Sequence, residues 1–188
     1  PELNHELDAL DPADFPAVPS GTALGWITFD AADFVRALRA VAVAASTDET
    51  RSNLNGVFIA PDGDNAAALT ATDGHRLHRA TLPAQHVLPT HWPRPENAPK
   101  SYVADRFAGF IVPRSAIAIL LRRINPVAGE RVVMQLRGTH VVVKVGVVEW
   151  TVRLVDDQFP DYTQVLPTSH DWTIEADGDT LDAAIEKL

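Results

Sequence analysis

The residues best suited to chemistry lie in two short groups. Asp73, His75 and His78 offer carboxylate and imidazole ligands of the kind that bind metal ions. The adjacent Asp156 and Asp157 offer two carboxyl groups, as general acid and base catalysis requires. On a strand, however, side chains at odd separations point to opposite faces, so the two histidines diverge, and so do the two aspartates. Solvated charges and a structural histidine explain these residues better, and we predict no metal site, no cofactor and no enzymatic activity.

Composition narrows the function classes further. The 188 residues contain no Cys, which removes disulfides, thiolate nucleophiles and zinc–thiolate sites and favours a reducing, cytoplasmic environment. Neither common Gly-rich phosphate-binding signature occurs. No apolar run approaches membrane-spanning length, and we expect no membrane partner. Because the first residue is Pro1 rather than Met, we expect that the chain has lost an N-terminal part.

The formal net charge of −9 bears on nucleic-acid binding. A tight, static DNA-binding protein usually has a basic surplus, because neutralised phosphates release counterions and supply most of the affinity. The acidic balance argues against such a protein. It remains compatible with a locally positive inner surface on an acidic body, and solubility alone is the simpler alternative.

A strand, a helix and three further strands are predicted in the first half of the chain. Trp26 to Phe29 alternates like a strand, Asp30 is a favourable helix N-cap, and Phe29 and Phe34 have the spacing of a hydrophobic staple. An apolar stripe at helical spacing extends the helix to about Ala45. Two Asp-Gly pairs, typical of hairpin turns, divide the later strands. These strands are expected at Gly56–Ala60, Ala67–Thr72 and His75–Leu82.

The same order of elements recurs after a proline-rich segment. Pro83–Pro99 carries five prolines and is expected to be a surface loop without regular structure. Pro113 then suits the first position of a second helix, whose apolar side is formed by Ile117, Leu120, Leu121 and Ile124. The strands of this second unit are expected at Phe110–Val112, Arg131–Leu136, His140–Val145 and Val148–Val155.

Each unit alone has one helix and too little sheet to bury its apolar face. Two β-α-β-β-β units related by a pseudo-twofold axis can join their sheets and pack both helices against one face. We therefore predict an α+β fold built from antiparallel sheets. The helix surfaces away from the core would then carry the arginines Arg36, Arg39, Arg114 and Arg122 together.

A sequence pattern that recurs over a longer distance suggests domain boundaries. Phe15-Pro16 followed by Trp26 recurs as Phe159-Pro160 followed by Trp172, and the two Phe residues lie 144 positions apart, which is the length of a domain. Each Trp is expected to open a strand, and the second copy is expected to continue into a helix from Leu181 to Leu188. We interpret residues 1–25 as a tail or linker that ends a preceding domain, 26–167 as a complete domain, and 168–188 as the start of another.

Three motifs then resemble the middle domain of the bacterial DNA polymerase III beta subunit, the replicative sliding clamp. They are Ser46–Arg51 with Leu54–Val57, Ala71–Leu77, and Arg153–Tyr162 with Val165–Pro167. The resemblance covers about Trp26 to Pro167. It implies the DNA-clamp fold, a three-domain protomer, and a homodimeric ring of the full-length protein around duplex DNA. A clamp of this family catalyses nothing and tethers the DNA polymerase III alpha subunit, the clamp loader and other partners that carry a clamp-binding motif.

The resemblance also implies two sets of site residues. The family's peptide-binding groove matches Leu54, Thr72, Gly74, His75, Arg76, Leu77, Pro160 and Val165. The residues expected to face DNA are Arg36, Arg39, Arg51, Arg114 and Arg122. A structural explanation competes for each groove position: a hairpin turn for Gly74, core packing for Leu54 and Leu77, and a strand end for Pro160. Gln164 departs from the basic residue common in the family.

The alternative function is a stand-alone clamp-like interaction module that does not encircle DNA. The two functions differ in whether further domains flank the chain. Since ring-closing surfaces of a clamp belong to its first and third domains, we expect these 188 residues alone to be monomeric or weakly associated. The sequence leaves the particular partners and the role of the proline-rich loop at 83–106 open.

Overall fold

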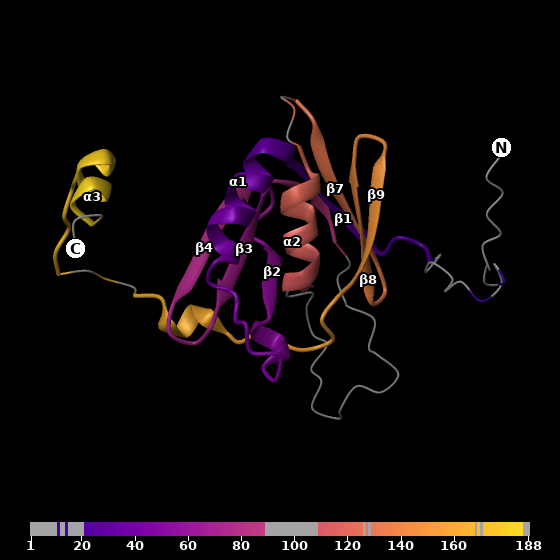
Figure 1. Ribbon diagram of the computed structural model, residues 1–188, viewed down its shortest axis with the longest axis horizontal. Coiled ribbons are helices and arrows are strands. Elements are labelled where there is room, and N and C mark those ends of the chain that lie inside the picture. The colour runs from indigo at the N-terminus through magenta and orange to yellow at the C-terminus, as the bar shows by residue number, and fades with distance from the viewer. Residues whose placement is uncertain are drawn as a thin grey trace, which may run out of the picture.

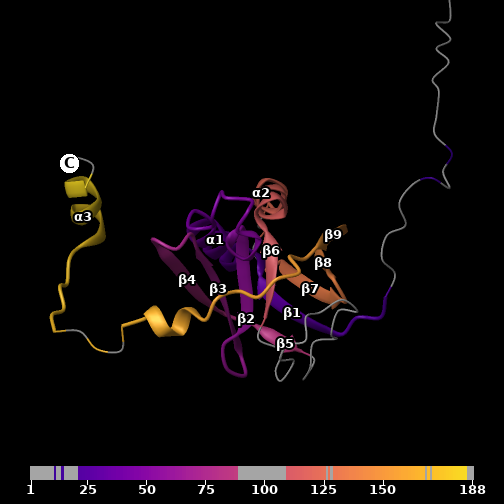
Figure 2. The same cartoon turned by 90° about the horizontal axis from the view of Figure 1, so that it is seen from below.

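Two antiparallel sheets and two neighbouring helices form the body of the molecule. The computed structural model describes residues 11, 14, 21–88, 109–125, 127, 129–167, 169 and 171–185. Helices α1 (Ala31–Ala42) and α2 (Arg114–Arg123) lie side by side on the same side of the sheets (Figures 1 and 2). The first Phe-Pro copy at residues 15 and 16, and positions 89–106 of the proline-rich loop, lie outside the described residues.

The two predicted units exchange their first strands. Strand β1 (Gly25–Asp30) leaves its own unit and pairs with β7 (Arg131–Arg137), where Ile27 opposes Met134. Strand β6 (Phe110–Pro113) pairs in return with β2 (Gly56–Pro61). The other strands are β3 (Ala66–Thr72), β4 (Leu77–Pro83), β5 (Gln85–Val87), β8 (His140–Val145) and β9 (Val148–Arg153). The two sheets have the strand orders β5-β1-β7-β8-β9 and β4-β3-β2-β6.

This exchange confirms the α+β architecture expected from the repeat, with both helices packed on one face of antiparallel sheets. One apolar core joins both units, because residues of α1, α2 and both sheets belong to a single buried cluster. Neither unit could bury that cluster alone, since each sheet needs a strand from the other unit.

The start of α1 follows the sequence signals. The Asp30 side chain accepts hydrogen bonds from the backbone N–H groups of Ala32 and Asp33, at 3.0 and 3.2 Å. The rings of Phe29 and Phe34 lie 5.1 Å apart, centroid to centroid, and both are fully buried. The N-cap and the hydrophobic staple are thus both confirmed, and they fix the direction in which the helix leaves β1.

The end of α1 comes earlier than its apolar stripe predicts. The helix stops at Ala42, after which the N–H groups of Ala44 and Ala45 bond to the carbonyls of Val41 and Ala42, three residues back. Both alanines remain buried. The stripe therefore continues through a tighter turn, and hydrophobic spacing alone could not separate this turn from α-helix.

Helix α2 begins one residue later than expected. Pro113 has an extended backbone with φ −65° and ψ 147°, ends β6, and caps the helix that starts at Arg114. On its inner side Ile117, Leu120 and Ile124 are buried, while Leu121 is partly covered. The predicted amphipathic pattern is therefore confirmed.

Both Asp-Gly pairs lie in turns, but the turns are longer than two residues. Thr72 pairs with Leu77, so residues 73–76 form the turn and β4 begins at Leu77 rather than at His75. Gly74 has φ 94°, in the left-handed region that favours glycine.

The last strand of the second unit ends earlier than the predicted Val155. Strand β9 ends at Arg153, and beyond it Val155 forms an isolated bridge to Ile111.

The prediction of no regular structure over Pro83–Pro99 was wrong for its first part. Gln85–Val87 forms β5, an edge strand on β1, and Ala84 donates its backbone N–H to the Asn65 carbonyl at 3.0 Å. None of the three strand residues is proline, and an edge strand needs pairing on one side only. Through β4 and β5 the chain thus crosses from one sheet to the other.

The segment after Trp172 differs from expectation as well. Trp172 is 89 % exposed, and residues 171–177 do not form the predicted strand, because a strand requires a hydrogen-bonded partner and no described strand provides one. Helix α3 (Gly178–Ile185) begins three residues before the predicted Leu181 and is exposed throughout. Within the described ranges, no helix is long and apolar enough to cross a membrane.

Candidate functional site

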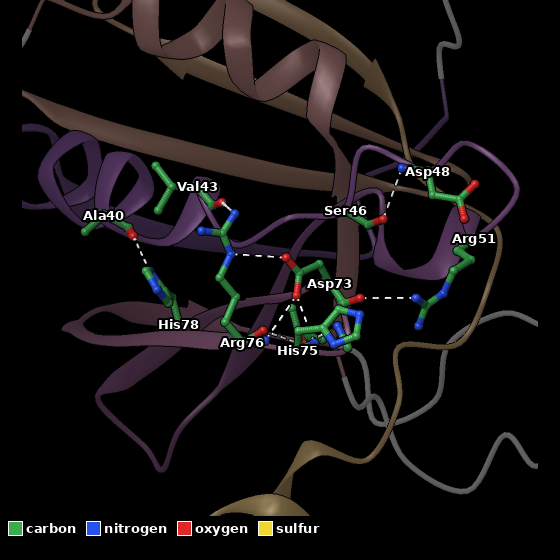
Figure 3. Close-up of polar contacts among 11 residues, drawn as sticks. Ala40, Val43, Ser46, Asp48, Arg51, Asp73, His75, Arg76 and His78 are labelled. Carbon is green, nitrogen blue, oxygen red and sulfur yellow. Dashed lines mark hydrogen bonds and ion pairs between the residues drawn. The ribbon is translucent and has the colours of Figure 1, made fainter.

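The turn between β3 and β4 is held in one shape by two side chains. Thr72 donates its hydroxyl to the Arg76 carbonyl at 2.7 Å and accepts the Gly74 N–H at 3.1 Å. The Asp73 carboxylate accepts the N–H groups of His75 and Arg76 through one oxygen, at 2.9 and 3.0 Å, and the Arg76 Nε through the other at 3.1 Å (Figure 3). We call Asp73–Arg76 the recognition loop; its backbone is ordered by these local hydrogen bonds.

These donors explain the acidity of Asp73. The backbone N–H groups of His75 and then Arg76 favour the ionised carboxylate and lower the pKa of Asp73 to about 2. Since this folded-state pKa lies below the ordinary value of 3.8, the interaction is fully present above pH 3.8 and is lost as the pH falls through about 2.

We therefore expect the Asp73 carboxyl resonance to stay constant from pH 8 down to pH 4. In the folded protein, carboxyl ¹³C NMR should place any titration well below the ordinary aspartate range. The same carboxyl in the urea-unfolded chain is the control and should titrate near 3.8. Equal midpoints in the two states would contradict the hydrogen-bonded loop.

Arg51 lies against this loop. Its Nη1 donates to the Asp73 carbonyl at 3.1 Å, and a Cβ added at Gly74 would stand 3.0 Å from its Nη2. A larger residue at position 74 would therefore displace the guanidinium as well as strain the backbone. The structure thus places Arg51 at the recognition loop, and its predicted contact with DNA stays a prediction.

The segments that carry the first and third sequence motifs contact each other. Ser52 donates its hydroxyl to the Asp157 carboxylate at 2.7 Å, across 105 positions of sequence. Leu54 is 4 % exposed and packs with Ile111 and Phe159 in a small apolar cluster. Phe159 stacks on Phe58 with centroids 4.8 Å apart. Leu54 therefore serves as core in this structure, in agreement with the structural explanation for this position.

The 3-10 turn η3 (Tyr162–Val165) lies beside the outer face of β4. A hydrogen bond with Tyr162 is the main cause that raises the pKa of Arg79, and the Asp62 carboxylate, 2.6 Å away, contributes less. Leu77 lies on the same face of β4 as Arg79, two residues away, and is half-buried. Val165 ends η3 and is 70 % exposed. We call the outer face of β4 together with the segment Pro160–Val165 the candidate groove.

The structure therefore divides the eight predicted groove residues. Gly74, His75 and Arg76 belong to the recognition loop, and Thr72 at the end of β3 hydrogen-bonds to it. Leu77, Pro160 and Val165 are at least partly accessible, whereas Leu54 is covered. Sequence reasoning did not single out Arg79, Phe58 or Tyr162, although Tyr162 lies within the third motif.

The predicted DNA-facing arginines of the helices are all exposed. Arg36 forms an ion pair with Asp33 at 2.6 Å, and Arg122 donates to the Ala118 carbonyl one turn back at 3.0 Å. Helix α2 contains no acidic residue and adds the exposed Arg123, which sequence reasoning did not include. The two helices are adjacent, and each carries exposed arginines on a protein whose net charge is −9. The exposed set is Arg36, Arg39, Arg114, Arg122 and Arg123.

Three of the residues considered above for metal binding or catalysis, His75, His78 and Asp157, have structural roles. His75 lies in the turn, while the Nδ1 atom of His78 lies 2.9 Å from the Ala40 carbonyl on α1 (Figure 3). Asp157 receives the Ser52 hydroxyl. Over the residues with described positions, no group of three or more His, Cys, Asp or Glu side chains is placed to hold a metal ion.

Comparison with known proteins gives these features a family context. The family described as "DNA polymerase III beta subunit, central domain" matches residues 28–92. The beta sliding clamp of Caulobacter vibrioides is 32 % identical over 185 residues, which are 97 % of this chain and 45 % of that protein. That of Escherichia coli is 29 % identical over 185 residues, 96 % of this chain and 44 % of the relative. The chain thus spans less than half the length of these curated relatives.

Solved structures agree with the sequence relatives. Caulobacter crescentus pol III beta has a TM-score of 0.69 at 30 % identity and covers 95 % of this chain and 44 % of its own. The DNA polymerase III subunit beta of Pseudomonas aeruginosa has a TM-score of 0.69 at 30 % identity and covers 86 % of this chain and 39 % of its own. The two-sheet, two-helix arrangement is therefore that of clamp structures.

Proposed function

We propose, on the premise that this chain is homologous to a segment of the bacterial DNA polymerase III beta subunit, that its protein is a sliding clamp. Such a protein has no catalytic step. It encircles duplex DNA in the cytoplasm as a homodimeric ring and tethers the replicative polymerase, the clamp loader and other partners. In this proposal residues 26–167 form the middle domain, and residues 168–188 lead into a third.

The placement of both helices on one side of the sheets carries the proposal. Both helices carry exposed arginines, while the whole chain has a net charge of −9. Exposed guanidinium groups attract phosphates without reading bases, and salt screens the attraction. A ring that must slide needs many weak contacts of this kind, because deep energy wells at particular phosphates would stall it.

In this proposal the candidate groove binds the partner proteins. Leu77 and Val165 offer partly accessible apolar surface on two neighbouring elements, and the recognition loop adds polar groups at one end. This combination suits an extended peptide with apolar anchor side chains, since apolar pockets supply affinity and a few fixed polar groups supply orientation. We assign the clamp-binding peptides of the DNA polymerase III alpha subunit and of other partners to this groove.

The exposed C-terminal segment supports a domain that continues beyond the middle one. Trp172 and Ile174 are each 89 % exposed, and Leu181 and Ile185 of α3 are more than half exposed. A group of exposed apolar side chains normally marks a surface that packs against another part of the protein or a partner. In the proposed clamp they belong to the core of the third domain.

The test is the assembly of the full-length protein. We expect native mass spectrometry to give the mass of two three-domain protomers, and residues 1–188 alone to sediment as a monomer or a weak dimer. Loaded full-length protein should remain on closed circular DNA and run off once the DNA is linearised. A monomer that stays equally well on both DNA forms would instead support the stand-alone interaction module.

A further inference from the structure

The end of helix α1 leaves backbone carbonyls without a helical partner, among them those of Ala40 and Val43. The Ala44 N–H, which would reach the Ala40 carbonyl in a continuing helix, bonds to Val41 instead at 3.0 Å. The Val43 carbonyl lies beyond the last helical residue. Unpaired terminal carbonyls need side-chain or solvent donors, and they form the negative end of the helix dipole.

Two side chains from the β4 hairpin reach these carbonyls. Arg76 Nη2 donates to the Val43 carbonyl at 2.8 Å, and His78 Nδ1 lies 2.9 Å from the Ala40 carbonyl (Figure 3). A carbonyl oxygen can only accept, so His78 must carry its proton on Nδ1. The helix is thus capped by residues that lie more than thirty positions later in the sequence.

Arg76 joins this cap to the recognition loop. Its Nε bonds to Asp73 within the loop, while its Nη2 bonds to the Val43 carbonyl at the end of α1, so one guanidinium connects both. His78 follows Leu77 on β4 and therefore lies on the opposite face of the strand, toward α1. Consequently His78 can affect the candidate groove only through the loop and the helix, because it does not face the groove.

We propose that Arg76 and His78 form a clasp that positions the recognition loop from the end of α1, with His78 as a positioning residue for peptide binding. This inference rests on the proposed groove. Coupling between two sites is reciprocal, so a peptide that holds the loop also holds the end of α1. The clasp therefore links groove occupancy to the helix that carries Arg36 and Arg39, two of the proposed DNA contacts.

Two substitutions at His78 separate the hydrogen bond from the size of the side chain. His78→Leu removes the donor and keeps an apolar side chain of similar bulk. His78→Asn keeps an N–H donor close to the position of Nδ1. In the full-length protein we expect His78→Leu to weaken binding roughly three- to tenfold, the range for removal of one hydrogen bond, and His78→Asn to bind almost as the unmodified protein does. The probe is a fluorescein-labelled clamp-binding peptide of the DNA polymerase III alpha subunit, measured by anisotropy.

Hydrogen exchange gives a readout that does not depend on the peptide. In the free protein, His78→Leu should speed exchange of the His75 and Arg76 amides, and His78→Asn should not. Added peptide should slow exchange at Ala44 and Ala45 in the unmodified protein, and His78→Leu should reduce that protection. Thermal unfolding of each variant checks that the fold is intact.

Each outcome supports or overturns the clasp. Unchanged peptide affinity and unchanged loop exchange in a folded His78→Leu protein would overturn it. Equal weakening by Leu and Asn would also overturn it, because the hydrogen bond would then be irrelevant. The variant Leu77→Asp, measured alongside, tests the groove itself. If it binds the peptide normally, the proposed groove fails and the role of the clasp in peptide binding fails with it.

Discussion

Leu77→Asp in the full-length protein is expected to weaken a clamp-binding peptide by roughly 30- to 1000-fold, the effect of removing a central anchor residue. Leu77 is half-buried on the outer face of β4, next to η3. A peptide anchor packed there would have to desolvate the new carboxylate, and an apolar anchor supplies no opposite charge to pair with it. Isothermal titration calorimetry measures the weakening directly.

Val165→Asp should act in the same direction but more weakly, because Val165 is the more exposed of the two. The matched control is Val147→Asp, the same chemical change at a fully exposed valine in the turn between β8 and β9. That control should bind the peptide normally. Normal binding by a folded Leu77→Asp protein would remove the groove assignment.

Retention on DNA is expected to fall at least about tenfold when Arg36, Arg114 and Arg122 are together changed to Glu. Each substitution removes a potential phosphate-binding cation from α1 or α2 and adds a charge that repels phosphate. The dependence of retention on salt should become shallower, by about one unit in the log–log slope for each phosphate interaction removed. Dissociation of labelled protein from circular DNA at several salt concentrations measures both quantities.

The control for this triple variant changes the same charge elsewhere. Arg131, Lys144 and Arg153 occupy strand positions that alternate with the core residues of β7, β8 and β9, so they lie on the face opposite the helices. Changing all three to Glu should leave retention nearly unaltered. Equal decreases in both triples would mean that only net charge matters. Wild-type retention in the helix triple would show that those arginines do not face the DNA.

Local features of the fold were predictable because contiguous residues encode them. The Asp30 cap and the Phe29–Phe34 contact each depend on side chains within a few positions of one another, and the Asp-Gly pairs marked turns. The hydrogen bonds of the recognition loop are also local, but the Asp-Gly signal predicted only a turn and missed its four-residue length. The doubled order of elements followed from hydrophobic periodicity, which repeats along the chain.

The features that were missed depend on residues far apart in sequence. No local pattern shows that β1 pairs with β7, that Phe58 stacks on Phe159, or that Arg76 reaches the end of α1. The early end of α1 is of the same kind, because its last carbonyls are satisfied by side chains from the β4 hairpin. The short strand β5 lies in a segment whose five prolines predict a loop, but its own three residues include no proline and can pair along β1.

The exchange of first strands has a consequence for how the chain folds. Asp30 pairs with Arg131, so the five-stranded sheet closes only when segments about a hundred residues apart have met. Such non-local pairing lowers folding rates, since loop-closure entropy is lost before the stabilising interactions form. During synthesis β1 emerges from the ribosome long before β7, so its apolar side chains stay exposed to solvent until β7 is available. The strand exchange that joins the two units therefore also prevents the nascent chain from completing the five-stranded sheet until β7 has been synthesised.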